Sequence, residues 1–329
     1  MSPAEEAVRE RLTDRRERLA AFASDQPEGE LVELLHRVDQ ALGRLEVGAW
    51  GLCAVCHVAI EPDLLETDPT VSVCFECLST EERRALERDL ESAARVQRAL
   101  LPARRLTHDG WEVAWLWEPK GAVSGDHVDL LVPEAPGGPL HLILGDVAGK
   151  GVAASLLQSH LHALFRALTS PDVPVADLLA RANRLFGGAT ASASYATLVA
   201  ARLSDDGTLE LANAGHPRPL VADRRGVRPV EGSGLPLGLF PGAAYTGHRL
   251  RLEAGDVALL YTDGWTEAAK DGEEYGVGRA AAALRHAVGE APGRSLGEIL
   301  AQCRDDMEHF LDGEERPDDL TLVAVRRTA

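Results

Sequence analysis

Two Cys-x-x-Cys pairs constrain the first third of the chain more than any other feature. Cys53 and Cys56 form one pair and Cys74 and Cys77 the other, with seventeen residues between the pairs. Two residues between thiolates let both sulfurs reach one tetrahedral ion at about 2.3 Å, so the spacing predicts Zn²⁺. A closed shell of four thiolates leaves no place for a substrate, so we expect a structural zinc that contributes to folding. A thioredoxin-like redox role is disfavoured, because there are two pairs and no strand–helix pattern beside them.

Helices are expected on both sides of the cysteines. The first carries apolar residues at alternating steps of four and three, namely Leu31, Leu35, Val38, Leu42 and Leu45. The second has a similar seam of Leu86, Leu90, Ala93, Gln97 and Leu100 and stops at Pro102, which cannot continue a helix. Gln97 is polar at a core-type position, a pattern typical of residues that fix register or partner number. We therefore expect a helical region over 1–47, a zinc finger over 48–80 and a linker helix over 81–102.

Residues 103–329 have the pattern of strands and helices expected of one large domain. Short apolar runs bounded by Gly, Pro and Asp predict strands, for example HLILGD, YATLVAARL, DVALLYTDG and DLTLVAVR. Longer stretches predict helices near 150–168, 175–186, 276–289 and 295–311. Strands and helices do not alternate regularly, so we expect an α+β fold with two sheets and external helices. Cys303 falls in the last helix among apolar residues at helical spacing and is interpreted as a core thiol.

Aspartates recur at the predicted strand ends of this domain, beside glycine. They are Asp126, Asp146, Asp263, Asp318 and Asp319. A single such residue is commonplace as a turn or helix cap, but several in one domain could be brought together by sheet pairing. Gathered carboxylates repel unless cations lie among them, and hard oxygen ligands select Mg²⁺ or Mn²⁺. The neighbouring glycines let the backbone come close, so the Val147 carbonyl is a further candidate ligand.

This donor set predicts hydrolysis by metal-activated water. Two cations can bind phosphate oxygens and acidify water, so attack on a phosphomonoester needs no protein nucleophile. The sequence fits, because it lacks a GxSxG elbow and its remaining cysteine lies inside a predicted helix. GDVAGKG is not a nucleotide-binding P-loop, because Leu144 stands five residues before Gly149 and Gly151 replaces the required Ser or Thr.

Charge and hydropathy exclude other classes. The net charge is −18, from 52 acidic and 34 basic residues, and residues 48–78 contain five acidic residues and no Lys or Arg. Phosphate contacts supply most non-specific affinity for nucleic acid, so we expect no nucleic-acid partner. No apolar run is long enough to span a bilayer, and MSPAEEAVRERLTDRRERLAAF lacks the apolar core of a signal peptide. We expect no membrane association and a cytoplasmic location.

The cysteine region resembles the DksA/TraR zinc-finger family. The resemblance spans roughly residues 38–80, in ALGRLEVGAWGLCAVCHVAIEPDLLETDPTVSVCFEC. It implies one zinc held by Cys53, Cys56, Cys74 and Cys77, and for some members a contact with RNA polymerase.

From about 83 to 327 the chain resembles the SpoIIE/RsbU-type branch of the PPM phosphatases. The matches run in order as ARVQRALLP, VSGDHVD, ILGDVAGKG, YATLVAARL, NAGHPRPLV, LPLGLF, LYTDGWTEA and PDDLTLVAV. The resemblance implies a four-layer αββα sandwich with a dinuclear Mn²⁺ or Mg²⁺ centre at the sheet edge. Asp146 and the Val147 carbonyl would hold the pair, completed by Asp126, Asp263 and Asp318. Asp319 is the adjacent alternative, and His127–Val128 replaces the usual aromatic pair.

The expected function is hydrolysis of phosphoserine or phosphothreonine on a regulatory protein. By family analogy this substrate is a STAS-type anti-anti-sigma factor. The rival is a non-catalytic transcription regulator that docks on RNA polymerase or another protein through the zinc finger. His216 could orient phosphate or donate a proton, or be structural, and Lys120 and Lys150 could bind phosphate or lie in solvent. The linker helix is expected to regulate activity and to form a homodimer, its alternative being a plain spacer.

Overall fold

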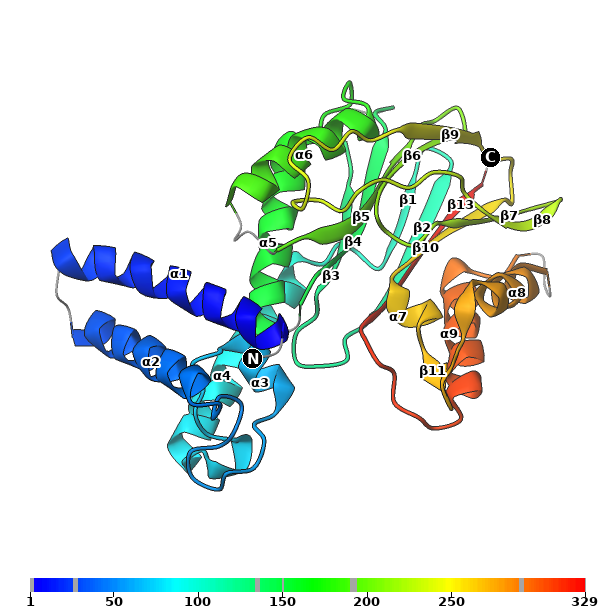
Figure 1. Cartoon of the computed structure of the whole chain (residues 1–329). Helices are drawn as coiled ribbons and strands as arrows, with labels where there is room; N and C mark the ends of the chain where they lie inside the picture. Colours follow the sequence, from blue (N-terminus) through cyan, green and yellow to red (C-terminus); the bar gives the residue numbers. More distant parts are fainter. Residues whose placement is uncertain are drawn as a thin grey trace. The chain divides into compact units, whose positions relative to one another are not determined.

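The computed structural model describes residues 3–25, 29–133, 137–149, 151–189, 194–289 and 293–328 (Figure 1). The chain divides into two compact units. The smaller comprises Met1–Ser92 with Lys150–Val152, and the larger comprises Ala93–Gly149 with Ala153–Ala329. The boundary at Ser92 falls inside helix α4 (Thr80–Leu100), the expected linker helix.

The smaller unit begins with two helices, α1 (Pro3–Asp25) and α2 (Gly29–Glu46), that pack on each other. Leu12 of α1 is buried against Val38, Ala41 and Leu45 of α2. Val38, Leu42 and Leu45 of the predicted seam therefore pack within the same chain, as the apolar face of an amphipathic helix requires.

The cysteine module follows α2 and contains little regular structure. Its elements are the short helix α3 (Pro62–Thr67), the 3₁₀ turn η1 (Phe75–Cys77) and an isolated bridge between Leu52 and Ala59. Its small core consists of Cys53, Ile60 and Cys74. Three buried side chains stabilise a module of this size poorly, so a metal is the expected additional support.

The larger unit contains two antiparallel sheets. The six-stranded sheet has the order β1-β2-β13-β10-β7-β8 and the five-stranded sheet the order β3-β4-β5-β6-β9. The strands of the first sheet are β1 (Arg105–His108), β2 (Trp111–Glu118), β7 (Leu220–Asp223), β8 (Gly226–Pro229), β10 (Val257–Tyr261) and β13 (Leu320–Arg327). Those of the second are β3 (Asp126–Leu131), β4 (Leu140–Val147), β5 (Ala196–Leu203), β6 (Thr208–Ala214) and β9 (Gly247–Arg251). A small hairpin joins β11 (Ala269–Lys270) to β12 (Glu273–Glu274).

Three hydrophobic clusters stack these sheets and helices into four layers (Figure 1). The middle cluster lies between the sheets, where Trp115 and Val323 meet Leu142 and Val199. Helices α5 (Gly151–Leu168) and α6 (Val175–Ala189) cover the five-stranded sheet. Helices α8 (Gly276–Gly289) and α9 (Leu296–Leu311) cover the six-stranded sheet, and the short α7 (Asp263–Thr266) follows β10. The predicted αββα sandwich is confirmed.

The predicted helices agree closely with α5, α6, α8 and α9. Helix α9 begins at a capping box in which Ser295 accepts a hydrogen bond from the Glu298 N–H and the Glu298 carboxylate accepts one from the Ser295 N–H. Cys303 is fully buried in this helix, and burial raises the pKa of its thiol to about 12, so the core-thiol interpretation fits. Within the described residues, no helix is long and apolar enough to cross a bilayer.

Candidate functional site

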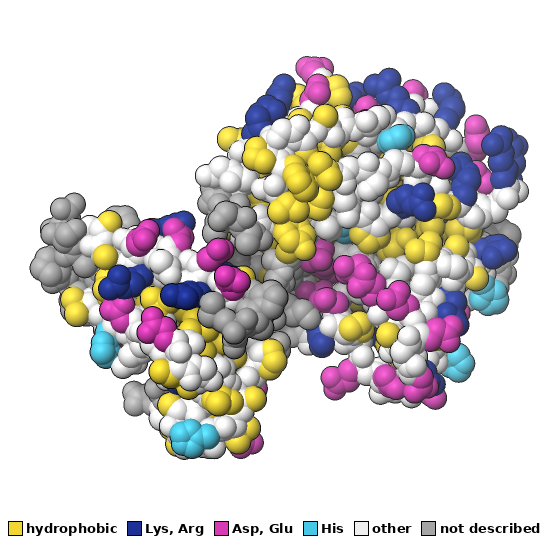
Figure 2. All heavy atoms as spheres, viewed as in Figure 1, with side chains coloured by type: hydrophobic (Ala, Val, Ile, Leu, Met, Phe, Trp, Pro, Cys, Tyr) yellow, Lys and Arg dark blue, Asp and Glu magenta, His cyan; other side chains and the backbone are white. Residues whose placement is uncertain are grey.

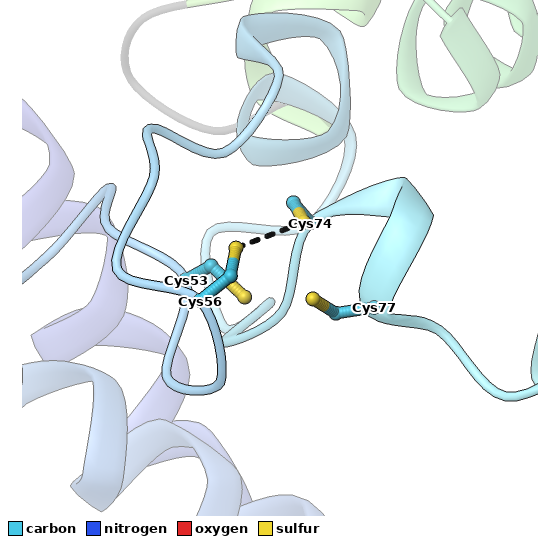
Figure 3. A group of neighbouring side chains, drawn as sticks. All are labelled: Cys53, Cys56, Cys74 and Cys77. Carbon is cyan, nitrogen blue, oxygen red and sulfur yellow. Dashed lines mark hydrogen bonds between the residues drawn. The ribbon is translucent and has the colours of Figure 1, made fainter.

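The four cysteines of the smaller unit converge on one point (Figure 3). Their sulfurs all lie within 4.8 Å of one another, and the Sγ atoms of Cys56 and Cys74 are 3.6 Å apart. Burial opposes ionisation of Cys53, but hydrogen bonds from the backbone N–H groups of Cys56, Cys74 and Val55 lower its pKa to about 6. Backbone donors directed at the Cys53 sulfur are the environment that a bound thiolate needs, whereas burial raises the pKa of Cys74 and hydrogen bonds with the other cysteines raise that of Cys77. The cluster is compatible with the predicted zinc finger.

In the larger unit, Asp126 begins β3 directly opposite Asp146 near the end of β4. Residues opposite each other in antiparallel strands have Cβ atoms only about 5 Å apart, so the two carboxylates share one neighbourhood. The Thr262 hydroxyl donates to Oδ2 of Asp126 at 3.0 Å, and the Thr321 hydroxyl donates to the same oxygen. Burial, and then the charges of Asp146 and Asp319, raise the pKa of Asp126 well above its ordinary value.

The strands of the other sheet bring further carboxylates to this point. Asp263 follows β10, and Asp318 and Asp319 precede β13, its neighbour in the sheet. Burial, followed by the charges of Asp263, Asp318, Asp319 and Glu267, raises the pKa of Asp146 to about 8. Burial and the charge of Asp318 also raise the pKa of Asp263. The carboxylates therefore lie close enough to oppose one another's ionisation.

Asp319 has a different environment, because it holds a loop. Its carboxylate accepts hydrogen bonds from the backbone N–H of Lys120 at 2.7 Å, the hydroxyl of Ser124 at 2.8 Å and the backbone N–H of Gly125 at 2.9 Å. The ammonium of Lys120 donates to the Pro317 carbonyl at 2.8 Å. Asp319 thus fixes the loop that leads into β3, which favours Asp318 over Asp319 as the ligand of this pair.

The backbone comes close to the carboxylates at Gly125. A Cβ atom added there would lie 3.0 Å from Oδ1 of Asp146 and 3.0 Å from the carbonyl oxygen of Val147. The Val147 carbonyl and the Asp146 carboxylate therefore both border the same glycine. Only a residue without a side chain leaves this space open for a ligand.

The aspartates are spread more widely than the cysteines. Among the described residues, two groups place three or more ligand atoms within 4.8 Å of one another: the four cysteines and a cluster of His127, Asp129 and His162. The aspartates form no such group. Carboxylates arranged around two cations, rather than one, lie on opposite sides of a larger centre, which suits this wider spacing.

A pocket borders Asp263. Its lining includes Thr197, His216, Arg218 and Glu267, and Figure 2 shows acidic side chains gathered on this face of the larger unit. His216 is buried, and burial lowers the pKa of its imidazole to about 3, so it is neutral near pH 7. Its Nδ1 lies 2.9 Å from the Thr197 hydroxyl. Whether His216 orients phosphate, donates a proton or is structural stays a prediction, and its hydrogen bond to Thr197 is the contact that a positioning role would use.

Sequence reasoning missed two residues of this region. Glu267 lies four residues after Asp263, and burial and the charge of Asp263 raise the pKa of its carboxyl. The exposed Arg218 lines the pocket two residues after His216. Glu267 lies in the motif TDGWTEA and Arg218 in NAGHPR. Their closeness in sequence to Asp263 and His216 is the signal that could have identified them. Lys150 lies outside the described residues.

Two facing antiparallel sheets with helices outside and aspartates at adjacent strand ends define a PPM-type phosphatase fold. The chain belongs to the SpoIIE family: the profile of that family, described as stage II sporulation protein E, matches residues 136–328. The predicted resemblance is thereby confirmed.

Two curated relatives are similar over most of the chain. Protein IcfG of Synechocystis is 24% identical over 269 residues, which are 73% of this chain and 41% of IcfG. Phosphoserine phosphatase RsbU of Bacillus subtilis is 23% identical over 248 residues, or 74% of this chain and 72% of RsbU. The chain therefore spans about two fifths of the length of IcfG.

Solved structures share the fold. The SiaA-PP2C domain of Pseudomonas aeruginosa has a TM-score of 0.64 at 21% identity, over 75% of this chain and 98% of that domain. RsbX, solved in complex with magnesium, has a TM-score of 0.50 at 16% identity, over 68% and 98% of the two chains.

Proposed function

We propose that this protein is a phosphatase that hydrolyses phosphoserine or phosphothreonine with the help of two divalent cations, Mn²⁺ or Mg²⁺. One observation carries the proposal: Asp126 and Asp146 face each other across two strands, beside Asp263 and Asp318, and the pKa of Asp146 is raised to about 8. Carboxylates packed this way are destabilised when ionised, and hard cations remove that cost. The donor set, all oxygen, suits these metals.

The ligands would be Asp126, Asp146, Asp263, Asp318 and the carbonyl of Val147. When bound, such cations supply the Lewis acidity that activates water and neutralises phosphate charge. Two threonine hydroxyls, from Thr262 and Thr321, hold the carboxylate of Asp126 in place.

The chain itself supplies the recognition of the substrate. Arg218 lines the pocket beside Asp263 and is exposed, so its guanidinium is available to a phosphate oxygen. The neutral His216 would position Thr197 through their hydrogen bond rather than donate a proton.

The substrate class rests on similarity. RsbU is a phosphoserine phosphatase, and it matches 74% of this chain. We therefore propose a phosphorylated regulatory protein as substrate, specifically a STAS-type anti-anti-sigma factor, which would link the enzyme to transcriptional control.

Hydrolysis of p-nitrophenyl phosphate and of a phosphoserine peptide, with and without Mn²⁺, tests the proposal. Asp146→Asn and Asp263→Asn should abolish turnover of both substrates while circular dichroism stays unchanged, because neutral amides cannot offset the charge of the cations. Asp172→Asn, an exposed aspartate in the turn after α5, is the matched control and should retain full activity. Activity within a few-fold of wild type for both site variants would refute the two-metal site.

The four cysteines would hold one structural Zn²⁺.

The alternative function is that of a non-catalytic regulator, which would dock on RNA polymerase or another protein through the zinc finger. Val55 and Val58, on and beside the first cysteine pair, are 66% and 62% exposed, which favours a protein contact at this surface. The two functions differ in one measurement: a regulator would bind RNA polymerase in pull-down experiments and show no Mn²⁺-dependent turnover.

A further inference from the structure

A second cluster of candidate metal ligands lies in the larger unit, between β3 and α5. His127 and Asp129 are two residues apart on β3, so their side chains share one face of the sheet. His162 of α5 meets them from the covering helix. One ligand atom from each of the three side chains lies within 4.8 Å of the other two.

The cluster leaves several polar atoms unsatisfied. Within the described residues, Nε2 of His127 and Oε1 of Gln158 are buried without a hydrogen-bond partner, and Nδ1 of His162 has only a 3.3 Å approach to Oδ2 of Asp129. His127 is completely buried, and its other ring nitrogen lies 3.0 Å from the Gln158 side-chain nitrogen. Unsatisfied atoms on two neighbouring buried side chains are unusual, because buried polar groups nearly always find a protein partner, a water or an ion.

The chemistry of the three side chains suits a cation. His127 is fully buried and the side chain of His162 is only 12% exposed, and neutral imidazole is a common metal ligand. The Arg166 guanidinium donates to both oxygens of Asp129, at 3.0 and 2.8 Å. The side chain of Arg166 is 49% exposed, so it can turn toward solvent when another cation takes its place.

We propose that His127, Asp129 and His162 bind one late first-row divalent cation of the Zn²⁺ class. Two imidazoles and one carboxylate are a donor set that zinc accepts, with a water or Gln158 as the fourth ligand. Ligand atoms around a tetrahedral zinc are roughly 3.3 Å apart. Nδ1 of His162 already lies 3.3 Å from Oδ2 of Asp129. The ligand atom of His127 lies within 4.8 Å of the other two and would approach them by a side-chain adjustment.

This site is distinct from the aspartate centre, although Asp126 directly precedes His127. Side chains alternate along a strand, and that of Asp126 reaches Thr262 and Thr321 of the six-stranded sheet. His127 and Asp129 face α5 instead. A cation between them would join β3 to α5, the helix that follows the Asp146–Val147 end of β4. It would therefore stiffen the support of the catalytic strands without contacting the substrate.

Zinc content of the full-length protein tests the proposal. After chelation, reloading with Zn²⁺ in excess Mg²⁺ and desalting, we expect about two zinc ions per chain in wild type, one at the cysteines and one at the new site. His162→Leu and the conservative His162→Gln should each retain about one. His160→Leu, on the same helix but in contact with Phe186, is the matched control and should retain both. The double variant Cys53→Ser, Cys77→Ser should lose the zinc of the cysteines and retain the zinc of the new site.

A second readout separates a lost site from a misfolded variant. With Co²⁺ in the Cys53→Ser, Cys77→Ser protein, a nitrogen–oxygen site gives weak visible bands without thiolate charge transfer, and His162→Gln should remove them. Zn²⁺ should also raise the melting temperature of this cysteine variant, and not that of the same variant carrying His162→Gln. If wild type holds only the zinc of the cysteines, or if the His162 variants hold as much as wild type, water fills the cluster and the proposal is wrong.

Discussion

Gln97 of α4 exchanges two hydrogen bonds with the backbone of Ser124. Its side-chain nitrogen donates to the Ser124 carbonyl at 2.6 Å, and its side-chain oxygen accepts from the Ser124 N–H at 3.0 Å. The Ser124 hydroxyl in turn donates to Asp319. One buried side chain thus connects the end of the linker helix, within the larger unit, to the loop that carries Asp126.

Replacing Gln97 with Leu should therefore weaken catalysis and stability together. The change leaves both backbone groups of Ser124 buried and unpaired, which costs about 1–3 kcal/mol for each group. We expect a lower melting temperature and a higher Mn²⁺ concentration for half-maximal turnover. Val96→Ala, at an adjacent position that is 58% exposed, is the control. An unchanged Mn²⁺ requirement in Gln97→Leu would show that the helix end does not influence the metal centre.

The metal-free protein should lose stability as the pH rises. Burial and the neighbouring carboxylates raise the pKa of Asp146 from 3.8 to about 8, so the folded chain keeps a proton that the unfolded chain has lost. Stability then falls across this interval, because the folded state binds more protons there. In EDTA, the melting temperature of wild type should fall between about pH 5 and 8, and that of Asp146→Asn should fall less. If the melting temperatures of wild type and Asp146→Asn fall equally with pH, the raised pKa does not belong to Asp146.

Zinc should be separable from catalysis. Cys53→Ser with Cys77→Ser should loosen the smaller unit, yet a fragment starting at Ala93 should hydrolyse p-nitrophenyl phosphate with Mn²⁺ as well as the full chain does. A fragment starting at residue 103 lacks Gln97 and should be less active, although it contains every proposed catalytic ligand. Equal activity of the two fragments would argue that the pairing of Gln97 with Ser124 is dispensable. An inactive Ala93 fragment would mean that catalysis needs the smaller unit and the zinc of its cysteines.

The linker helix is also proposed to form a homodimer. Leu90 and Ala93 are partly exposed on α4, so they are available to a second copy of the chain. Leu90→Glu with Ala93→Glu should lower the mass measured by light scattering and reduce turnover of a protein substrate. Arg98→Glu, on the exposed side of the same helix, is the control. If the double variant has the same mass and the same turnover as wild type, the helix is only a spacer.

Sequence patterns predicted the layers well and the contacts between distant residues poorly. Strand and helix positions follow from local periodicity, and the αββα sandwich followed from the motifs. The heptad-like spacing of α4 led us to interpret Gln97 as a seam residue, but its partner, Ser124, is 27 residues away and no local pattern reveals it. His127 and His162 were likewise separate in the sequence, and only the packing of α5 on β3 brings them together.

Strand β13 pairs with β2 on one side and β10 on the other, at the centre of the six-stranded sheet. Asp318 lies just before this strand, and Thr321 within it binds Asp126. During synthesis, β2 and β10 leave the ribosome long before the strand that separates them. Asp318 and Thr321 therefore join the site only when the last strand of the sheet has been synthesised. Chains that stop upstream of β13 should therefore lack the strand that joins β2 to β10 and be inactive as phosphatases.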